Sequence, residues 1–356
     1  MELLKNEERA VFALRALYRR YGYVGYKMSQ FEEYDLYVRN KDFLLSDRII
    51  TFSGSGGRLL ALKPDVTLSI VKNAPDAPGA VQKLYYNENV YRDYREIIQT
   101  GLECVGDLGD YEIAEVVLLA AKSLQLLGGR FVLDISHMGL VAAILSSCGL
   151  TPVEQKQALA YLRRKNTHEL KALCGGNDDA WKKLSELAAC RGNDRKVLET
   201  VSRVLTTEEE RQALSELEGL WRVLEGSGCA GNVCLDFSVG SDMGYYSGVV
   251  FRGYLEGIPA SVLSGGQYDK LAEKMGKHCR AIGFAVYLDL LEARQEETDD
   301  SVDTLILHDG TTDTAALTLA AEAAAKDGSV LVAGAAPERR RWKRLVDLRK
   351  GAIRND

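Results

Sequence analysis

Apolar residues in the first part of the chain follow two different spacings. Between Asn6 and Tyr21 they stand three and four positions apart, as at Val11, Leu14 and Leu17, which predicts a packed helix. The segments that follow are short, β-rich and separated by turn signals such as SGSGG, so they predict strands of an antiparallel sheet. These strand-like segments read RIITFS, GRLLALKP, VQKLYYNENVYR and EIIQTGLECVGD.

Helices and strands then alternate. The Pro64–Asp65 pair predicts a helix over 66–72, and an apolar helix over 114–127 ends at a glycine pair that suits a C-cap. A strand over 131–134 and a helix over 138–147 follow. Further along the chain the patterns predict strands at 233–237, 245–254 and 282–286, and a helix at 287–296.

Long helical patterns replace strands from about Thr151 to Gly228. TEEE offers an N-cap followed by acidic first-turn residues, as at the start of a helix. The helical segments read TPVEQKQALAYLRRK, NDDAWKKLSELAAC and TEEERQALSELEGLWRVLEGSG. This texture predicts a helical insertion within a sheet domain.

The last part of the chain predicts a separate small unit. The acidic stretch EETDD suits a linker, and DTLILHDG, a helix over 312–326 and SVLVAG then predict a β-α-β arrangement. The basic ERRRWKRL (338–345) could contact nucleic acid, but we favour a solvated helix face. The fold class is therefore α+β, with a core of 1–150 and 229–296, a helical insertion of 151–228 and a C-terminal α/β unit of 301–356.

Composition narrows the class of protein without singling one out. The chain has 356 residues, 27% charged and 46% apolar, with a net charge of −6, as in an ordinary globular protein of more than one domain. The slightly acidic balance argues against a large nucleic-acid footprint, since phosphate binding normally needs a basic face.

The cysteines and the N-terminus point to the cytoplasm. Seven scattered cysteines without a CxxC pair predict reduced, mostly buried thiols, and the four histidines make no metal spacing, so we expect no metal and no cofactor. Acidic residues and arginines interrupt the apolar pattern of the first helix, which excludes a signal peptide. No apolar run approaches the ~20 residues of a membrane span. We therefore expect a cytoplasmic protein.

Two neighbouring segments carry the most specific signal. LDFSVGSDMGYYSGVVF (235–251) contains the pair Tyr245 and Tyr246, and SGGQYDKL (264–271) follows it closely. On a strand the two tyrosines would point to opposite faces, so at most one would stack on a ligand. Aromatic pairs in strands are often core residues, but nearby glycines let backbones come close around a small ligand. We expect Asp269 to cap the helix that follows.

Two earlier segments add polar candidates. In LALKPDVT (60–67), Asp65 and Thr67 stand where a helix begins and could simply cap it. In NVYRDYREIIQTGLECVG (89–106), Gln99 and Glu103 are four positions apart on a predicted strand, so their side chains share a face. Arg92 could form a surface ion pair with a nearby carboxylate, which would contribute little stability.

Together with AIGFAVYLDLLE (281–292), these motifs stand in the order found in histidyl-tRNA synthetase, which the chain resembles from its N-terminal helix to about Glu296. The resemblance implies the fold of a class II aminoacyl-tRNA synthetase, an antiparallel sheet with flanking helices. It also implies that a histidine molecule is bound. The residues to which it assigns histidine binding are Asp65, Thr67, Arg92, Gln99, Glu103, Tyr245 and Tyr246.

The resemblance gives each of these residues a role. Asp65 and Thr67 would bind the α-ammonium of histidine. Glu103 would accept a hydrogen bond from the imidazole while Gln99 reads the polar end of the ligand, and Arg92 would meet the carboxylate or an ATP phosphate. Tyr245 and Tyr246 would close over the histidine side chain.

Three departures from the family pattern concern the chemistry. Ser241 stands where the synthetase carries a catalytic arginine, and only Asp93–Ile98 remains of the loop that holds ATP and the tRNA end. Asp289 stands at about the position of the arginine that grips the γ-phosphate, and a reversed charge is incompatible with binding ATP in that way. We therefore expect that no histidyl-adenylate forms and that tRNA binding is absent.

A retained pocket with a lost catalyst resembles the synthetase paralogues that are regulatory subunits of ATP phosphoribosyltransferase. This implies a subunit without enzymatic activity of its own, which activates the short-form catalytic subunit and makes it respond to histidine in histidine biosynthesis. Such coupling between sites typically amounts to ~1–3 kcal/mol and is reciprocal. The resemblance also implies a homodimer within a hetero-oligomer, although Ser29 stands near the proline expected in the segment that builds the dimer interface.

Two alternatives stay open. One is a divergent but active histidyl-tRNA synthetase, which would need a basic path for tRNA and a replacement for each missing arginine. The other is a free-standing histidine-binding module with a different partner.

Overall fold

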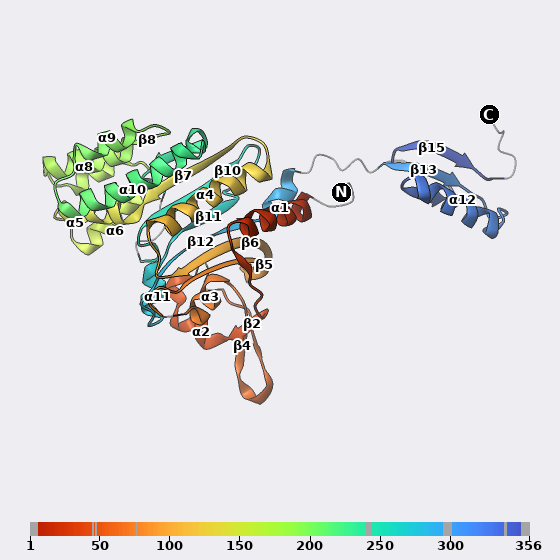
Figure 1. Ribbon diagram of the computed structural model, residues 1–356, viewed down its shortest axis with the longest axis horizontal. Helices are drawn as coiled ribbons and strands as arrows, with labels where there is room; N and C mark the ends of the chain where they lie inside the picture. Colours follow the sequence, from red (N-terminus) through yellow and green to blue (C-terminus); the bar gives the residue numbers. More distant parts are fainter. Residues whose placement is uncertain are drawn as a thin grey trace. The chain divides into compact units, whose positions relative to one another are not determined.

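The computed structural model describes residues 6–44, 46, 48–75, 77–239, 244–294, 301–337 and 340–349. It divides into two compact units, Met1–Arg294 and Gln295–Asp356 (Figure 1). The α+β class and the class II synthetase-like core predicted from the sequence are confirmed.

A nine-stranded sheet of the described residues forms the centre of the first unit, in the order β1-β5-β6-β12-β11-β10-β7-β9-β8. The sheet is mixed and not purely antiparallel, because β1 pairs with β5 and β7 pairs with β9 in parallel. Parallel neighbours need a crossover connection, and the helical segment 152–226 lies between β7 and β9. The strands are β1 (Val24–Gly25), β5 (Val81–Arg92), β6 (Arg95–Gly106), β7 (Phe131–His137), β8 (Arg191–Gly192), β9 (Val233–Asp236), β10 (Val249–Leu255), β11 (Leu263–Gln267) and β12 (Arg280–Tyr287).

The long hairpin of β5 and β6 closes in the tightest common way. Its pairing extends to Arg92 opposite Arg95, so the turn consists of Asp93 and Tyr94 alone. Both have left-handed backbones, with φ of 50° and 62°, as a two-residue type I′ turn requires. The expected shortening of this connection is confirmed.

The two faces of the sheet bury different side chains. On β6, Leu102 and Cys104 join the cluster under the helices α1 (Asn6–Arg20), α4 (Asp110–Leu127) and α5 (Met138–Ser147). Val105, which points the other way, joins a second cluster with Leu68 and Leu271. Figure 1 shows α4 and α1 lying across the strands, and α3 and α11 at the other side.

The second face is covered by short elements. A small antiparallel sheet in the order β2-β4-β3 stands beside it. The elements here are β2 (Phe31–Glu33), α2 (Tyr34–Arg39), the 3₁₀ helix η1 (Lys41–Phe43), β3 (Thr51–Ser53), η2 (Ser55–Gly57), β4 (Leu59–Leu62), α3 (Thr67–Asn73) and α11 (Asp269–Lys274).

The helical segment shares the core of the sheet and is not a detached module. Its buried Leu159, Leu184 and Leu217 belong to the same cluster as Leu133 and Phe251 of the sheet. Capping boxes, Thr151 with Glu154 and Thr207 with Glu210, begin two of its helices. Its elements are α6 (Pro152–Arg163), α7 (Thr167–Leu173), α8 (Asp178–Ala189), α9 (Lys196–Ser202), α10 (Glu208–Gly226) and η3 (Ala230–Asn232).

A buried ion pair holds two of these helices together. Lys183 on α8 and Glu210 on α10 are buried, and the Nζ atom of Lys183 lies 2.6 Å from an Oε atom of Glu210. Lys183 also donates to the hydroxyls of Ser147 and Thr206, so its three protons all have acceptors. Burial opposes the charge of Glu210. The hydrogen bonds that its carboxylate accepts from Lys183, from Ser147 and from the amides of Thr206 and Thr207 outweigh this effect and lower its pKa to about 2.

The second unit is a three-stranded parallel sheet with one helix, in the strand order β14-β13-β15. The elements are β13 (Val302–Leu307), α12 (Thr314–Asp327), β14 (Val330–Ala333) and β15 (Trp342–Asp347). The expectation of a basic helix face was wrong, because residues 342–345 of that segment belong to the edge strand β15 and the described residues before them are not helical. Its Lys343 pairs with Asp303 at 2.7 Å.

Two further corrections concern element types. The predicted strand 245–254 begins only at Val249. The described part of the predicted helix 287–296 is the end of β12 followed by the 3₁₀ helix η4 (Asp289–Arg294), and its last two residues lie outside the described residues. Seven free cysteines are present, five of them buried, as expected. Within the described residues no group of side chains suits a metal ion, and no helix is long and apolar enough to cross a membrane.

The Lys183–Glu210 pair generates a stability prediction. Lys183→Met should lower the free energy of unfolding by about 3–5 kcal/mol at pH 7, because it leaves a buried carboxylate without its cation. The pair stabilises the fold above about pH 4.5, and this contribution is lost as pH falls toward the folded-state pKa of about 2. Urea titrations should therefore show a smaller difference in the free energy of unfolding between the wild type and Lys183→Met at pH 3 than at pH 7.

The exposed neighbour Lys182 provides the matched control, since Lys182→Met removes the same charge from the same helix. If Lys183→Met and Lys182→Met were equally stable at pH 7, the stabilising role of the buried pair would be contradicted.

Candidate histidine pocket

All seven residues singled out from the sequence line one pocket of about 240 Å³ on the face of the sheet opposite α4. It lies between β6, β11 and β12 on one side and the start of α3 and the Tyr245–Tyr246 turn on the other. Its size is below the ~300–1,000 Å³ common for larger ligands, so it suits one small molecule. The structure brings the seven together, and their role in binding histidine stays a prediction.

Glu103 forms the floor of the pocket. Its carboxylate accepts a hydrogen bond from the Tyr268 hydroxyl and another, of 2.9 Å, from Oγ1 of Thr67. On the neighbouring strand only a glycine fits, since a Cβ on Gly283 would lie 1.6 Å from Oε2 of Glu103. Burial raises the pKa of this carboxyl to about 8, although both hydroxyls work in the opposite direction.

Gln99 lies one step along the same face. Its side chain is only 2% exposed, and its Nε2 has no acceptor among the described residues. A buried amide donor without a partner is costly, about 1–3 kcal/mol, so such groups usually serve a ligand. The same-face arrangement of Gln99 and Glu103 predicted from their spacing is confirmed.

Asp65 and Arg92 form the polar wall. An oxygen of Asp65 accepts from the Leu68 amide at 2.9 Å, and the other lies 3.8 Å from the Arg92 guanidinium. Arg92 also donates to the Pro64 carbonyl at 2.7 Å. Burial raises the pKa of Asp65 despite the nearby arginine. The carboxylate therefore supports the start of α3 and faces the pocket, and Arg92 pairs with it in the pocket wall instead of forming the alternative surface ion pair.

Thr67 does not act as a helix cap, because its hydroxyl donates to Glu103.

A second ion pair supports the polar wall from the side away from the pocket. Lys63, whose side chain is fully buried, pairs with Glu88 on β5 and so holds the end of β4 against the hairpin. The turn that carries Asp65 follows directly from this anchored residue.

The tyrosine pair closes the pocket from a turn and not from a strand. The rings of Tyr245 and Tyr246 meet edge to face with centroids 4.6 Å apart, and Tyr245 also lies 5.6 Å from the ring of Phe43. Both rings line the pocket, because the pair precedes the strand and the opposite-face geometry of a strand does not apply to it. Tyr246 lies over Gly266, where a Cβ would stand 2.7 Å from its ring.

Sequence reasoning missed Tyr268. It belongs to the GGQYD segment, and its hydroxyl reaches Glu103 from the start of α11. We had expected its neighbour Asp269 to cap that helix, and this was wrong. The carboxylate of Asp269 accepts from the Ala281 amide at 2.8 Å and from the Gln267 side chain at 2.6 Å. The motif itself was the available signal, since its tyrosine is the only aromatic side chain in it.

The three departures in the catalytic motifs have different outcomes. Ser241 lies outside the described residues. Asp289 is exposed on η4 and does not line the pocket. The hairpin turn leaves no loop over the pocket, since only Asp93 and Tyr94 connect the two strands.

Comparisons with known proteins agree with this geometry. A model of the histidyl-tRNA synthetase family matches residues 2–291. The chain is 29% identical to an ATP phosphoribosyltransferase regulatory subunit from Oceanobacillus iheyensis, over 76% of this chain and 69% of the relative. It is 27% identical to the protein of that name from Alkaliphilus metalliredigens, over 81% and 78% of the two chains.

Solved structures show the same fold. A regulatory subunit/histidyl-tRNA synthetase from Bacillus halodurans is similar with a TM-score of 0.77 and 25% identity, covering 98% of this chain and 95% of that one. Histidyl-tRNA synthetase from Nostoc has a TM-score of 0.72 at 17% identity, covering 93% and 83%. A chain of the ATP phosphoribosyl transferase (HisG:HisZ) complex from Thermotoga maritima has a TM-score of 0.62 at 17% identity, covering 79% of this chain and 97% of that one. Since the family match spans every element that lines the pocket, this chain belongs to the histidyl-tRNA synthetase family.

Proposed function

We propose that this chain is a regulatory subunit of ATP phosphoribosyltransferase, which binds histidine in the pocket described above and joins a short-form catalytic subunit in the cytoplasm. The names of its relatives support the regulatory role. In this proposal the chain activates its partner and transmits the histidine signal to it, and it does not activate histidine for transfer to tRNA.

The pairing of Gln99 with Glu103 carries the proposal. A buried carboxylate can accept from an imidazole N–H, and the amide of Gln99 supplies a donor that has no acceptor among the described residues. Asp65 offers a carboxylate for an ammonium group, and Arg92 a guanidinium for a carboxylate. Histidine carries all of these groups on one small molecule, with an aromatic ring for the tyrosine pair.

The segment in which the resemblance expects the arginine that grips the γ-phosphate carries no cation. The segment 283–291, GFAVYLDLL, contains no lysine or arginine. A triphosphate held without compensating charge is strongly disfavoured in a partly desolvated site. Together with Ser241 and the short hairpin turn, this supports an amino-acid pocket without adenylate chemistry.

An active synthetase is the second candidate, because the amino-acid pocket is intact and the family match is to histidyl-tRNA synthetase. Pyrophosphate exchange separates the two functions. The purified chain should show no histidine-dependent exchange of pyrophosphate into ATP above a no-enzyme control, with an active histidyl-tRNA synthetase run in parallel. Clear exchange would defeat the regulatory proposal.

Above about pH 8, where Glu103 is ionised, Glu103→Gln should weaken histidine binding about tenfold to a hundredfold, because it replaces a charge-assisted hydrogen bond contributing roughly 1.5–3 kcal/mol. Calorimetric titration with histidine measures the loss. Glu96→Gln, an exposed change on the same strand, should leave the affinity unchanged. Unchanged histidine affinity in Glu103→Gln, with a lower melting temperature, would mean that Glu103 is structural only.

The same variant has a defined pH signature. Because the pKa of Glu103 is raised to about 8 in the fold and is near 4.5 when unfolded, the native state keeps a proton that the unfolded state releases. Wild-type stability should therefore fall between about pH 4.5 and pH 8 relative to that of Glu103→Gln. Melting temperatures measured across this pH range test the direction of this change. If the melting temperatures of the two proteins changed with pH in parallel, the prediction would be refuted.

The chain should form a homodimer, because the small sheet exposes apolar side chains that are costly on a stable monomer. Phe31 is 47%, Phe52 38% and Leu59 47% exposed, and the two phenylalanine rings lie 5.7 Å apart. Light scattering should give a dimer mass for the wild type and a monomer mass for Phe31→Glu/Phe52→Glu. Val153→Glu, at a more exposed apolar site on α6, should remain dimeric.

A further inference from the structure

A second hollow lies on the opposite side of the sheet from the histidine pocket. It is a cleft of about 580 Å³ between α4 and α10, and its floor is formed by His137, Val249 and Gln267 of the sheet. Figure 1 shows the two helices side by side above the strands. We call this hollow the α4–α10 cleft.

The walls of the α4–α10 cleft are apolar. Ile113 and Leu118 of α4 face Leu217, Leu220 and Val223 of α10 across it. At the mouth, Tyr111 is 66% and Val223 40% exposed, which is unusual for large apolar side chains that border a concave surface. The cleft can therefore take an apolar side chain from outside and remove it from water.

The cleft continues around α10. A shallower groove of about 650 Å³ follows the other side of the helix against α5, where Gly139, Ala142 and Ala143 keep the surface low. The cleft and the groove share His137, Gln212 and Glu216, so they form one surface that follows the length of α10. An elongated surface of this kind suits a segment of polypeptide better than a compact small molecule.

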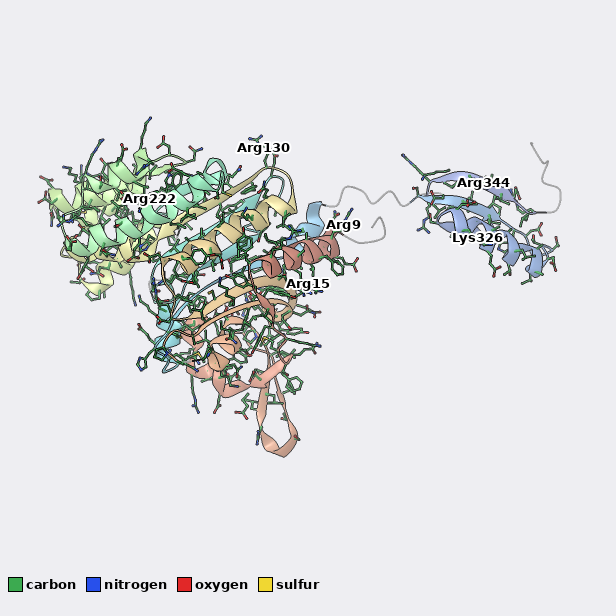
Figure 2. All side chains as sticks on the ribbon, in the orientation of Figure 1. Arg9, Arg15, Arg130, Arg222, Lys326 and Arg344 are labelled. Carbon is green, nitrogen blue, oxygen red and sulfur yellow. The ribbon has the colours of Figure 1, made fainter. Side chains whose placement is uncertain are left out.

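Carboxylates dominate its rim. The acidic residues that line the two hollows are Asp110, Glu115, Glu208, Glu209 and Glu216, and the described basic ones are Arg222 and Arg280. Glu115 pairs with Lys83 and Glu208 with Arg211, so the carboxylates that have no such lysine or arginine partner among the described residues still outnumber Arg222. Arg280 lies 3.9 Å from Asp269 and donates to the Leu108 carbonyl, so much of its charge is already used inside the protein. Arg222 projects from α10 in Figure 2. The balance favours a partner with lysine or arginine beside its apolar anchor.

Glu216 is fixed in place. Its carboxylate lies 3.3 Å from Nε2 of His137, whose Nδ1 accepts from the Leu140 amide at the start of α5. Since Nδ1 accepts, the ring proton is on Nε2 and is donated to Glu216. A held carboxylate costs less side-chain entropy when a cation binds it than a mobile one would.

We propose that the α4–α10 cleft and its adjoining groove are the docking surface for the catalytic partner subunit, which inserts an apolar side chain flanked by basic residues. This inference rests on the proposed function, because it requires that a catalytic partner exists. It names the place of contact and the chemistry of the contacting segment.

The position of the cleft also links it to the histidine pocket. Gln267 of the cleft floor precedes Tyr268, which donates to Glu103. The Ser247 amide donates to the Gln267 carbonyl at 2.9 Å, and the Met138 amide to that of Gly248 at 2.8 Å, so the turn with the tyrosine pair is tied to the same floor. A partner that shifts this floor would change the pocket, and histidine would change partner affinity by the same factor.

The test measures binding of the full-length chain to purified short-form ATP phosphoribosyltransferase catalytic subunit. Val223→Trp fills the mouth of the cleft and should weaken the equilibrium affinity at least about tenfold. Gln212→Lys/Ser215→Lys adds two positive charges at exposed sites of the acidic rim and should lower the association rate about tenfold at low salt. This difference in rate should vanish toward ~1 M salt.

Two variants serve as matched controls. Val153→Trp on α6 adds the same bulk at an exposed valine outside both hollows, and Glu199→Lys on α9 makes the same change in charge. Both should bind as the wild type does, and melting curves should show all four variants folded.

Wild-type affinity and association rate in both cleft variants would overturn the docking site while leaving the proposed function standing. Failure of the wild-type chain to bind the catalytic subunit at all would overturn the proposed function, and this inference with it.

Discussion

The Glu103 carboxylate is the constraint around which the functional half of the molecule is arranged. It is buried in the middle of a nine-stranded sheet, so it needs partners from other elements, and it finds them in Thr67 of α3 and Tyr268 at the start of α11. The two hydroxyls pull both helix starts toward the sheet. The requirement for a glycine at position 283 follows from the same group, because its oxygen occupies the space of a Cβ.

The sheet separates this polar face from an apolar one. Along β6, every second residue enters the core beneath α4, while Gln99 and Glu103 point the other way. The helical segment adds its leucines to the apolar face, and the pair Lys183 and Glu210 holds its helices α8 and α10 together. The proposed histidine pocket and the proposed docking surface therefore lie on opposite sides of one sheet, with Gln267 and Tyr268 as neighbours that face each side.

The polar wall of the pocket serves the fold as well as the proposed ligand. Asp65, Thr67 and Glu103 are tied into backbone or side-chain hydrogen bonds that the fold itself uses. Removing them would leave buried donors or acceptors without partners. Two positions of the ATP site that the resemblance implies are exposed instead. Asp289 is exposed on a 3₁₀ helix and Asp93 lies in a turn, so charges there can change without disturbing the core.

The sequence by itself determined the class of the fold, most of the long helices and the set of pocket residues. Strong periodicity identified α4, α8 and α10, and the four-residue spacing of Gln99 and Glu103 placed both on one face because strand geometry alternates. Motif order supplied the remaining pocket residues. These features depend on local pattern or on short stretches of chain, which a single sequence displays.

Only the tertiary structure decided how Tyr245 and Tyr246 share the pocket, since they lie in a turn whose shape depends on Gly266 beneath it. It also revealed Tyr268 as the partner of Glu103 across 165 positions of sequence, and the parallel pairing of β7 with β9. The described part of the helical pattern of 287–296 became a strand end and a 3₁₀ helix, and residues 342–345 of the basic segment became part of an edge strand. In each case contacts between distant segments outweighed local preference, and no periodicity along the chain records such contacts.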